Sequence, residues 1–252
     1  AADKATFDAL PPGHREALHQ LARLRRRLHL PPWRFSAELT AAGAAHVRYH
    51  VTNCMAGRPP TGHFERPSDP GYSAEGDRAA RSSGISFGAK TPVRALESFL
   101  SGPYHRAQFV ARQSGRIGVA SGGGEQRKST RSPGRRVHHI VNCGVTLFPF
   151  EHDRVRRPRP QGPRFLRFPP DQATKVPTLF PGERPDPRPP GARPTGYPAT
   201  IHLRPEDSKR LQGVRAVMRG PGGADVPLWL ADPGRPAVKQ PPMGIYGAGG
   251  VV

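Results

Sequence analysis

The N-terminal part of the chain has apolar residues at every third or fourth position, which predicts amphipathic helices. In the segment 14–30, four leucines share one face: Leu18, Leu21, Leu24 and Leu28. We expect four arginines of the same segment to project mostly outward: Arg23, Arg25, Arg26 and Arg27. Because proline cannot continue a helix, this helix is expected to end at Pro31-Pro32.

Two further helices are predicted from their starting residues. Ser36 is a good N-cap residue, and the Ala-rich stretch 37–53 behind it has the spacing of a second helix. Thr91-Pro92 joins an N-cap residue to a proline at the first helical position. A short third helix is therefore expected between Thr91 and Gly102-Pro103.

The pattern outside these helices is less regular. Residues 58–87 are rich in Pro, Gly, Ser and charged residues and are interpreted as a long loop, a kind of segment that is usually functional or disordered. Residues 116–120 and 138–148 are strand candidates. The stretch 122–136 between them has the composition of a linker.

Beyond Pro149, short strand-like pieces alternate with Pro/Gly turns, at a spacing of roughly 10–15 residues that suits a small β-sandwich. The pieces are residues 178–180, 199–203, 214–218 and 226–230. We expect a boundary near residue 165. The chain ends at Val252, which leaves open whether the sandwich is complete.

Composition makes the chain strongly basic without identifying a partner. Its 252 residues include 39 Lys plus Arg against 19 Asp plus Glu, for a formal charge of +20. Residues 111–168 hold 13 of the basic and 3 of the acidic residues, and so half of the net charge. Most of the basic residues are Arg, which fits recognition of phosphate or carboxylate and equally fits a GC-rich genome. The Gly and Pro residues follow no repeat, which excludes collagen-like chains.

Cysteine content and hydropathy restrict the class further. Cys54 and Cys143 are the only cysteines, which excludes a disulfide-dense miniprotein and a Cys-only zinc site. One disulfide would fit an exported chain, but the sequence does not show whether the two approach each other. No apolar run approaches the ~18–20 residues that a membrane span needs, and no signal-peptide pattern is present. We expect a mature or truncated chain from which any export signal has been removed.

Two histidines and nearby carboxylates are candidates for a polar site. His63 lies in the long loop and His105 follows the third helix. Imidazoles from different segments can share a metal ion or a cleft, although chance placement among 11 histidines explains the spacing equally well. Glu65, Glu75 and Asp77 can orient an imidazole or complete a metal shell, or they can form a solvated acidic turn.

Other chemistry is not indicated. The basic tract 126–136 can attract anionic polymers, but no nucleic-acid motif accompanies it, so no specific nucleic-acid partner is expected. The sequence has no nucleophile elbow, no P-loop and no HExxH or CxxC motif.

The order of these features resembles the CAP superfamily, the cysteine-rich secretory, antigen-five and pathogenesis-related proteins, in its bacterial secreted SCP-like branch. Residues 28–53 look like the family's opening pair of helices, and residues 62–88 like its His-bearing loop and apolar turn. Residues 91–109 look like its third helix with the Gly/Pro-x-His-Arg motif, and residues 116–120 match the following strand. The resemblance covers residues 12–120.

This resemblance implies an α+β fold. A CAP-type α-β-α sandwich is expected over residues 1–148, with a basic insertion at about 121–137. A Pro/Arg-rich linker over residues 149–168 then leads to an accessory β-rich domain, the small β-sandwich, over residues 169–252.

The resemblance also implies site residues. His63 and His105 match the family's two cleft histidines, which in many members line a cavity with two glutamates and in some bind a divalent cation such as zinc. The chain departs from this pattern, because Ser83 stands where the first glutamate is expected and Gly102 where the second often sits. Glu65 or Glu75 can substitute for one of them, so Glu65, Glu75 and Ser83 are candidate ligand-binding residues.

Three functions remain open. The favoured one is a secreted or cell-envelope CAP-domain protein, monomeric and noncatalytic, that binds a small molecule, a lipid or a divalent cation at its histidines. A metal-assisted or His/Glu hydrolase is an alternative that the two missing glutamates disfavour. A charge-driven protein that binds an anionic cell-envelope polymer is the third, and its binding would weaken steeply with salt.

Overall fold

In a computed structural model, the chain divides into two compact units. The first comprises Ala1–Leu24, Pro31–Phe99 and Gln113–Pro158, and the second Arg25–Leu30, Leu100–Arg112 and Arg159–Val252. The structure describes residues 2–59, 61–132, 135–153, 163–180, 182–183, 186–188, 191, 195–204, 207 and 214–231, and only the backbone of 127–139. None of the helices in these ranges is long and apolar enough to cross a membrane.

The three predicted helices are confirmed. They are α2 (Pro12–Arg27), α3 (Ala37–Met55) and α5 (Pro92–Ser101), and a short helix α1 (Ala2–Ala9) precedes them. Ser36 caps α3, because its hydroxyl accepts a hydrogen bond from the backbone N–H of Leu39 at 3.2 Å. The Thr91 hydroxyl accepts one from Arg94 N–H in the same way at α5, also at 3.2 Å.

The first unit is built on a mixed sheet with the strand order β1-β3-β7-β2, and β4 pairs with β7 beside this path. The strands are β1 (Trp33–Phe35), β2 (Ser83–Phe87), β3 (Gly115–Ile117), β4 (Ala120–Gly122) and β7 (Val145–His152). β1 and β3 are parallel, and the pairs with β7 are antiparallel. The predicted strand 116–120 is thus divided between β3 and β4.

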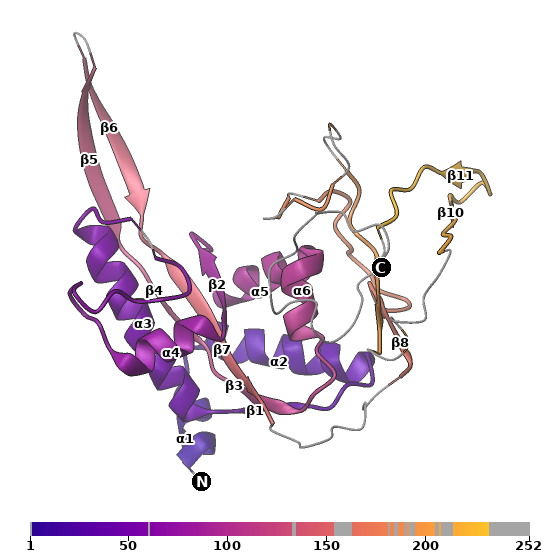
Figure 1. The fold of residues 1–252 in the computed structure, drawn as a ribbon, viewed down its shortest axis with the longest axis horizontal. Coiled ribbons are helices and arrows are strands. Elements are labelled where there is room, and N and C mark those ends of the chain that lie inside the picture. The colour runs from indigo at the N-terminus through magenta and orange to yellow at the C-terminus, as the bar shows by residue number, and fades with distance from the viewer. Residues whose placement is uncertain are drawn as a thin grey trace. The chain divides into compact units, whose positions relative to one another are not determined.

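Alternate residues of β7 face different helices, as the two-residue period of a strand requires. Val145 and Leu147 pack with Val47 of α3 in one hydrophobic cluster. Phe148, on the opposite face, contacts Phe99 of α5 with ring centroids 6.2 Å apart. Helices on both faces of the sheet give the α-β-α layering that the resemblance implied (Figure 1).

Two sequence interpretations were wrong. The segment 58–87 is not a loop throughout, because it contains α4 (Ala74–Arg81) and β2. The stretch 122–136 is not a linker either, because it contributes to the strands β5 (Glu125–Ser132) and β6 (Arg135–Asn142). These two strands pair along their whole length into an antiparallel ribbon, which extends beyond the sheet in Figure 1.

The base of the β5–β6 ribbon is tied to the end of α3. Cys54 and Cys143 form a disulfide that joins the last turn of α3 to the residue after β6. The side-chain amide of Gln126 donates a hydrogen bond to the Met55 carbonyl at 2.7 Å. The question of cysteine pairing, which the sequence left open, is therefore settled in favour of a disulfide.

The second unit combines residues 25–30 and 100–112 with the C-terminal part of the chain. It contains α6 (Pro103–Phe109) and the paired strands β8 (Phe165–Phe168) and β9 (Thr200–Leu203). A second short pair is β10 (Met218–Arg219) with β11 (Asp225–Val226). The predicted strand 199–203 is confirmed as β9, and Phe180 forms an isolated bridge with Thr195. The β-sandwich itself stays a prediction, and parts of it and of the linker, residues 154–162 and 232–252 among them, lie outside the described residues.

One prediction for the first helix was wrong. Arg25 does not project outward but is 1% exposed. Its guanidinium donates to the carbonyls of Phe109 at 2.9 Å and Ala111 at 3.0 Å within the second unit. Burial lowers its pKa to about 9.

Candidate functional site

A buried histidine–glutamate pair lies under the loop that follows α3. His46 Nδ1 and Glu65 Oε1 are 3.0 Å apart, and Glu65 Oε2 accepts the backbone N–H of Ser73 at 2.8 Å. Burial lowers the pKa of His46 to about 4 and raises that of Glu65. Because both shifts disfavour the charged forms, burial favours an uncharged pair that shares one proton.

The same loop is held to α3 by a second polar contact. The Tyr49 hydroxyl donates to Asp69 Oδ2 at 2.9 Å and accepts the backbone N–H of Arg66 at 3.0 Å. Asn53 donates to the carbonyl of Pro70 at 2.9 Å. One face of α3 therefore fixes the loop from Glu65 to Pro70.

The three predicted ligand-binding residues lie in different environments. Glu65 is buried in the pair just described. Glu75 is exposed on α4 and lies 3.6 Å from Arg78 in an ion pair. Ser83 is 3% exposed, and its hydroxyl donates to the Ala79 carbonyl. The structure thus gives Glu65 and Ser83 internal partners and leaves Glu75 in solvent.

His63 is anchored in the first unit through one ring nitrogen. Nδ1 lies 3.0 Å from the carbonyl oxygen of Ala80. Since a carbonyl can only accept, Nδ1 carries the proton in this contact, and the lone pair of the neutral ring lies on Nε2. Donation from one nitrogen to a carbonyl is how proteins orient imidazoles that use the other nitrogen as a ligand.

His105 is anchored in the second unit by a carboxylate that the sequence analysis missed. Its Nδ1 lies 2.5 Å from Oε1 of Glu183, whose side chain is 2% exposed. The same carboxylate accepts the backbone N–H groups of His105 at 2.7 Å and of Tyr104 at 3.1 Å. Glu183 is 78 residues from His105, and no local pattern marks it.

Arg106, the other charged residue of the motif, is a structural group. Its guanidinium is completely buried and donates to the Leu100 carbonyl at 2.7 Å and to the Thr200 hydroxyl at 2.8 Å. It also lies over the ring of Phe168, 4.1 Å from the centroid. Burial lowers its pKa to about 10, so it stays charged at neutral pH. This residue fastens β8 and β9 to α6.

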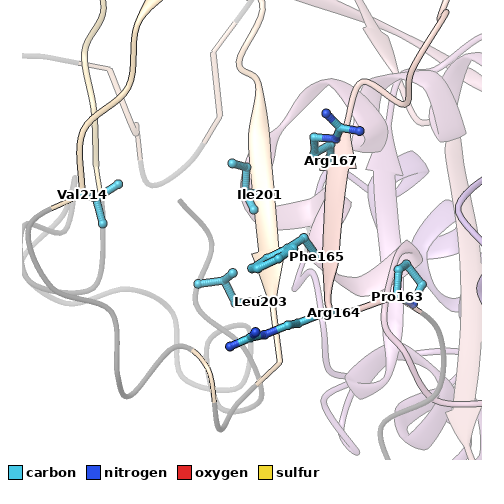
Figure 2. A pocket seen from close by; sticks show the side chains of 7 residues that line it. All are labelled: Pro163, Arg164, Phe165, Arg167, Ile201, Leu203 and Val214. Carbon is cyan, nitrogen blue, oxygen red and sulfur yellow. The ribbon is translucent and has the colours of Figure 1, made fainter.

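An open apolar groove of about 540 Å³ lies along β8 and β9 (Figure 2). Phe165, Ile201 and Leu203 are among its lining residues. Arg164 and Arg167 at its edge are ion-paired with Asp207 at 2.8 Å and with Asp171 at 2.6 Å. The groove therefore offers apolar contact, and its arginines already have acidic partners.

The described residues do not build a zinc centre of the usual kind. No group of three or more His, Cys, Asp and Glu side chains among them is placed to hold a metal ion. Zinc sites take three or four protein ligands, whereas Glu65 and Glu183 accept hydrogen bonds from the protein itself. Two oriented imidazoles suit a weak, exchangeable cation better than a resident one.

Comparison with known proteins gives one match. The family model of the cysteine-rich secretory protein family, CAP, matches residues 18–143. No curated protein and no solved structure matches the chain. The matched range is half of the chain, and it contains the sandwich, both histidines and the disulfide. The chain therefore belongs to the CAP family of cysteine-rich secretory proteins.

Proposed function

We propose that the chain is a noncatalytic binding protein that takes a small ligand or an exchangeable divalent cation at His63 and His105. The observation that carries the proposal is the anchoring of both rings through Nδ1, to a carbonyl at His63 and to a carboxylate at His105. Each neutral ring then has its lone pair on Nε2, ready to coordinate or to accept a hydrogen bond.

Catalysis is the weaker alternative. A hydrolase of the Ser type needs a hydroxyl beside a base, but the Ser83 hydroxyl is buried and donates to a backbone carbonyl. Glu65, the carboxyl nearest to His63 in the sequence, is buried against His46 and Ser73. These contacts hold both groups in structural roles.

The setting that fits this function is outside the cell or in the cell envelope. Disulfides persist in oxidising compartments, and Cys54 and Cys143 form one. We place the protein in the bacterial secreted branch of the family on the sequence resemblance, as a monomer.

Titration of the purified protein with Zn²⁺, followed by calorimetry, tests the proposal. We expect saturable binding that is lost in the double variant His63→Ala/His105→Ala and retained in His19→Ala, which removes an exposed histidine from α2. Equal binding by the wild type and the double variant would overturn the assignment. A small organic ligand would be sought by the same comparison in a metabolite panel.

A second function, binding of an anionic polymer, is favoured by the β5–β6 ribbon. The two strands contain five Arg and Lys residues and one Glu: Arg127, Lys128, Arg131, Arg135, Arg136 and Glu125. The register pairs Arg131 with Arg136. Like charges directly opposite each other destabilise a ribbon, and a bound polyanion would relieve this repulsion.

Salt dependence tests this second function. Binding of a fluorescent anionic polysaccharide should weaken steeply between 50 and 200 mM salt (about those concentrations), because charge neutralisation releases counterions. Arg131→Gln/Arg136→Gln should weaken binding, whereas Arg23→Gln/Arg26→Gln on α2 should not. A flat response to salt would dismiss the proposal.

A further inference from the structure

The strongest unassigned relationship joins the C-terminal segment to the histidine of the CAP motif. Glu183 lies outside the matched range 18–143, yet its carboxylate accepts three hydrogen bonds from Tyr104 and His105. A carboxylate with only 2% of its side chain exposed must satisfy its charge inside the protein. These donors satisfy it, so Glu183 has a built site beside His105.

Gly102 provides the space for this carboxylate. A Cβ atom at Gly102 would lie 2.5 Å from Oε1 and 2.6 Å from Cδ of Glu183, which is closer than real contacts allow. The backbone of Gly102 has φ −87° and ψ 128°, a conformation open to every residue. The backbone therefore does not require glycine here, and the carboxylate does.

The segment that carries Glu183 is fixed in place by further contacts of the second unit. The backbone N–H of Phe180 donates to the Thr195 carbonyl at 3.0 Å. The Tyr197 hydroxyl donates to the Leu100 carbonyl at 2.9 Å, just before α6. The Arg106 guanidinium donates to the Pro198 carbonyl at 3.1 Å. The chain on both sides of Glu183 is thus held by specific hydrogen bonds.

We propose that Glu183 is the positioning residue of His105, supplied by the C-terminal segment into the space that Gly102 leaves. By accepting the Nδ1 proton, Glu183 selects the tautomer with its lone pair on Nε2 and fixes the plane of the ring. The proposal rests on the proposed function, because it takes Nε2 as the atom that meets the ligand.

This role also defines the class of ligand. His63 is held in the same tautomer by the Ala80 carbonyl, so both neutral rings present an acceptor atom. An acceptor pair binds a cation or a hydrogen-bond donor, such as an ammonium or a hydroxyl group, and does not bind an anion. The ligand at the histidines is therefore a divalent cation or a donor-rich small molecule.

Histidine tautomers can be measured without any ligand. In the ¹⁵N-labelled full chain, two-bond ¹H–¹⁵N correlations distinguish a protonated Nδ1 from a protonated Nε2, and His105→Ala assigns the signals. We expect the Nδ1–H pattern for His105 in the wild type and in Glu183→Gln, whose amide oxygen can still accept. Glu183→Ala should lose that pattern, and Asp171→Asn, which removes an exposed carboxylate of the same unit, should keep it.

The outcomes separate this proposal from the proposed function. An unchanged Nδ1–H pattern in Glu183→Ala overturns the positioning role, whatever Zn²⁺ does. If the pattern changes but Zn²⁺ and the metabolite panel bind no variant, the positioning role stands and the proposed function fails.

Binding adds a second readout. Where Zn²⁺ binds the wild type, its affinity should fall about 10-fold or more in Glu183→Ala, the range found when the partner of a liganding histidine is removed. Inorganic phosphate that binds the wild type and not His63→Ala/His105→Ala would overturn the ligand class. If Glu183→Ala does not fold, Gly102→Ala gives the same test, because its methyl group displaces the carboxylate without removing it.

Discussion

His46 and Glu65 meet inside the first unit, with Nδ1 and Oε1 3.0 Å apart and side-chain exposures of 1% and 0%. Ionising either partner places a charge where water cannot reach it, which is costly unless the other partner compensates. Gly76 lies directly against this carboxyl, and a Cβ there would overlap it. The pair therefore has one arrangement, and it ties the loop after α3 to the helix.

The first prediction concerns the pH dependence of stability. Burial lowers the pKa of His46 to about 4 from the model value 6.5, so between these values the unfolded chain binds more protons than the folded one. Stability is therefore complete above the higher value and is lost as the pH falls. Between pH 7.5 and 5.5, His46 should account for about 1.4 kcal/mol, measured by urea unfolding.

Two variants assign this effect. His46→Gln should remove that share of the pH dependence, whereas His19→Gln on the surface of α2 should not change it. His50, whose pKa burial also lowers to about 4, adds a similar contribution that persists in both variants. Identical slopes for the wild type and His46→Gln would show that His46 is not buried as the structure has it.

The second prediction concerns the loop after α3. Tyr49→Phe removes the hydroxyl that bonds Asp69 and Arg66 and should cost about 1–2 kcal/mol. Because the lost contacts belong to the loop, limited proteolysis should cut between residues 58 and 72 faster than in the wild type. Tyr72→Phe, at an exposed position, is the matched control. Unchanged cleavage in Tyr49→Phe would contradict the role of this hydroxyl.

The sequence was sufficient for features that depend on local pattern. The leucine spacing of 14–30 and the caps Ser36 and Thr91 predicted three helices correctly, because capping and amphipathicity act within one or two turns. The order of motifs likewise led to the CAP family. The ribbon was missed because its strands carry Arg, Lys and Ser in place of an alternating apolar pattern, although Pro133-Gly134 is a turn signal.

The features that the sequence did not reveal depend on distant partners. Arg25 has the same helix neighbours as Arg26 and Arg27, but carbonyls 84 and 86 residues away receive its hydrogen bonds. Glu183 is one acidic residue in a proline-rich stretch until Gly102 and His105 come against it. A motif search looks near the motif, and these groups complete it from far along the chain.

The third prediction concerns the disulfide. Cys54 and Cys143 are separated by 89 residues, and closing a loop of that size stabilises a domain by about 4–5 kcal/mol in the chain-entropy account. Cys54→Ser/Cys143→Ser should lower the urea midpoint accordingly, and reduction of the wild type with dithiothreitol should lower it by a similar amount. If dithiothreitol leaves the wild-type midpoint in place, the cysteines do not form this bond in solution.

The last prediction concerns Arg106, whose planar guanidinium makes several contacts that no other side chain can reproduce. It bonds Leu100, Pro198 and Thr200 and stacks over Phe168. Lysine keeps the charge but offers a compact ammonium group, which cannot reach these acceptors in the same geometry. Arg106→Lys should therefore destabilise the second unit by about 3 kcal/mol.

Hydrogen exchange locates this loss. Amides of β8 and β9 should exchange faster in Arg106→Lys, while those of β7 in the first unit keep their protection. Arg116→Lys, at a solvent-accessible ion-paired site, should change stability by less than about 1 kcal/mol. If Arg106→Lys is no more destabilising than Arg116→Lys, the guanidinium does not fasten the C-terminal strands to α6. Glu183 would then lose the anchoring that holds it beside His105, and the tautomer of that ring should change in the same variant.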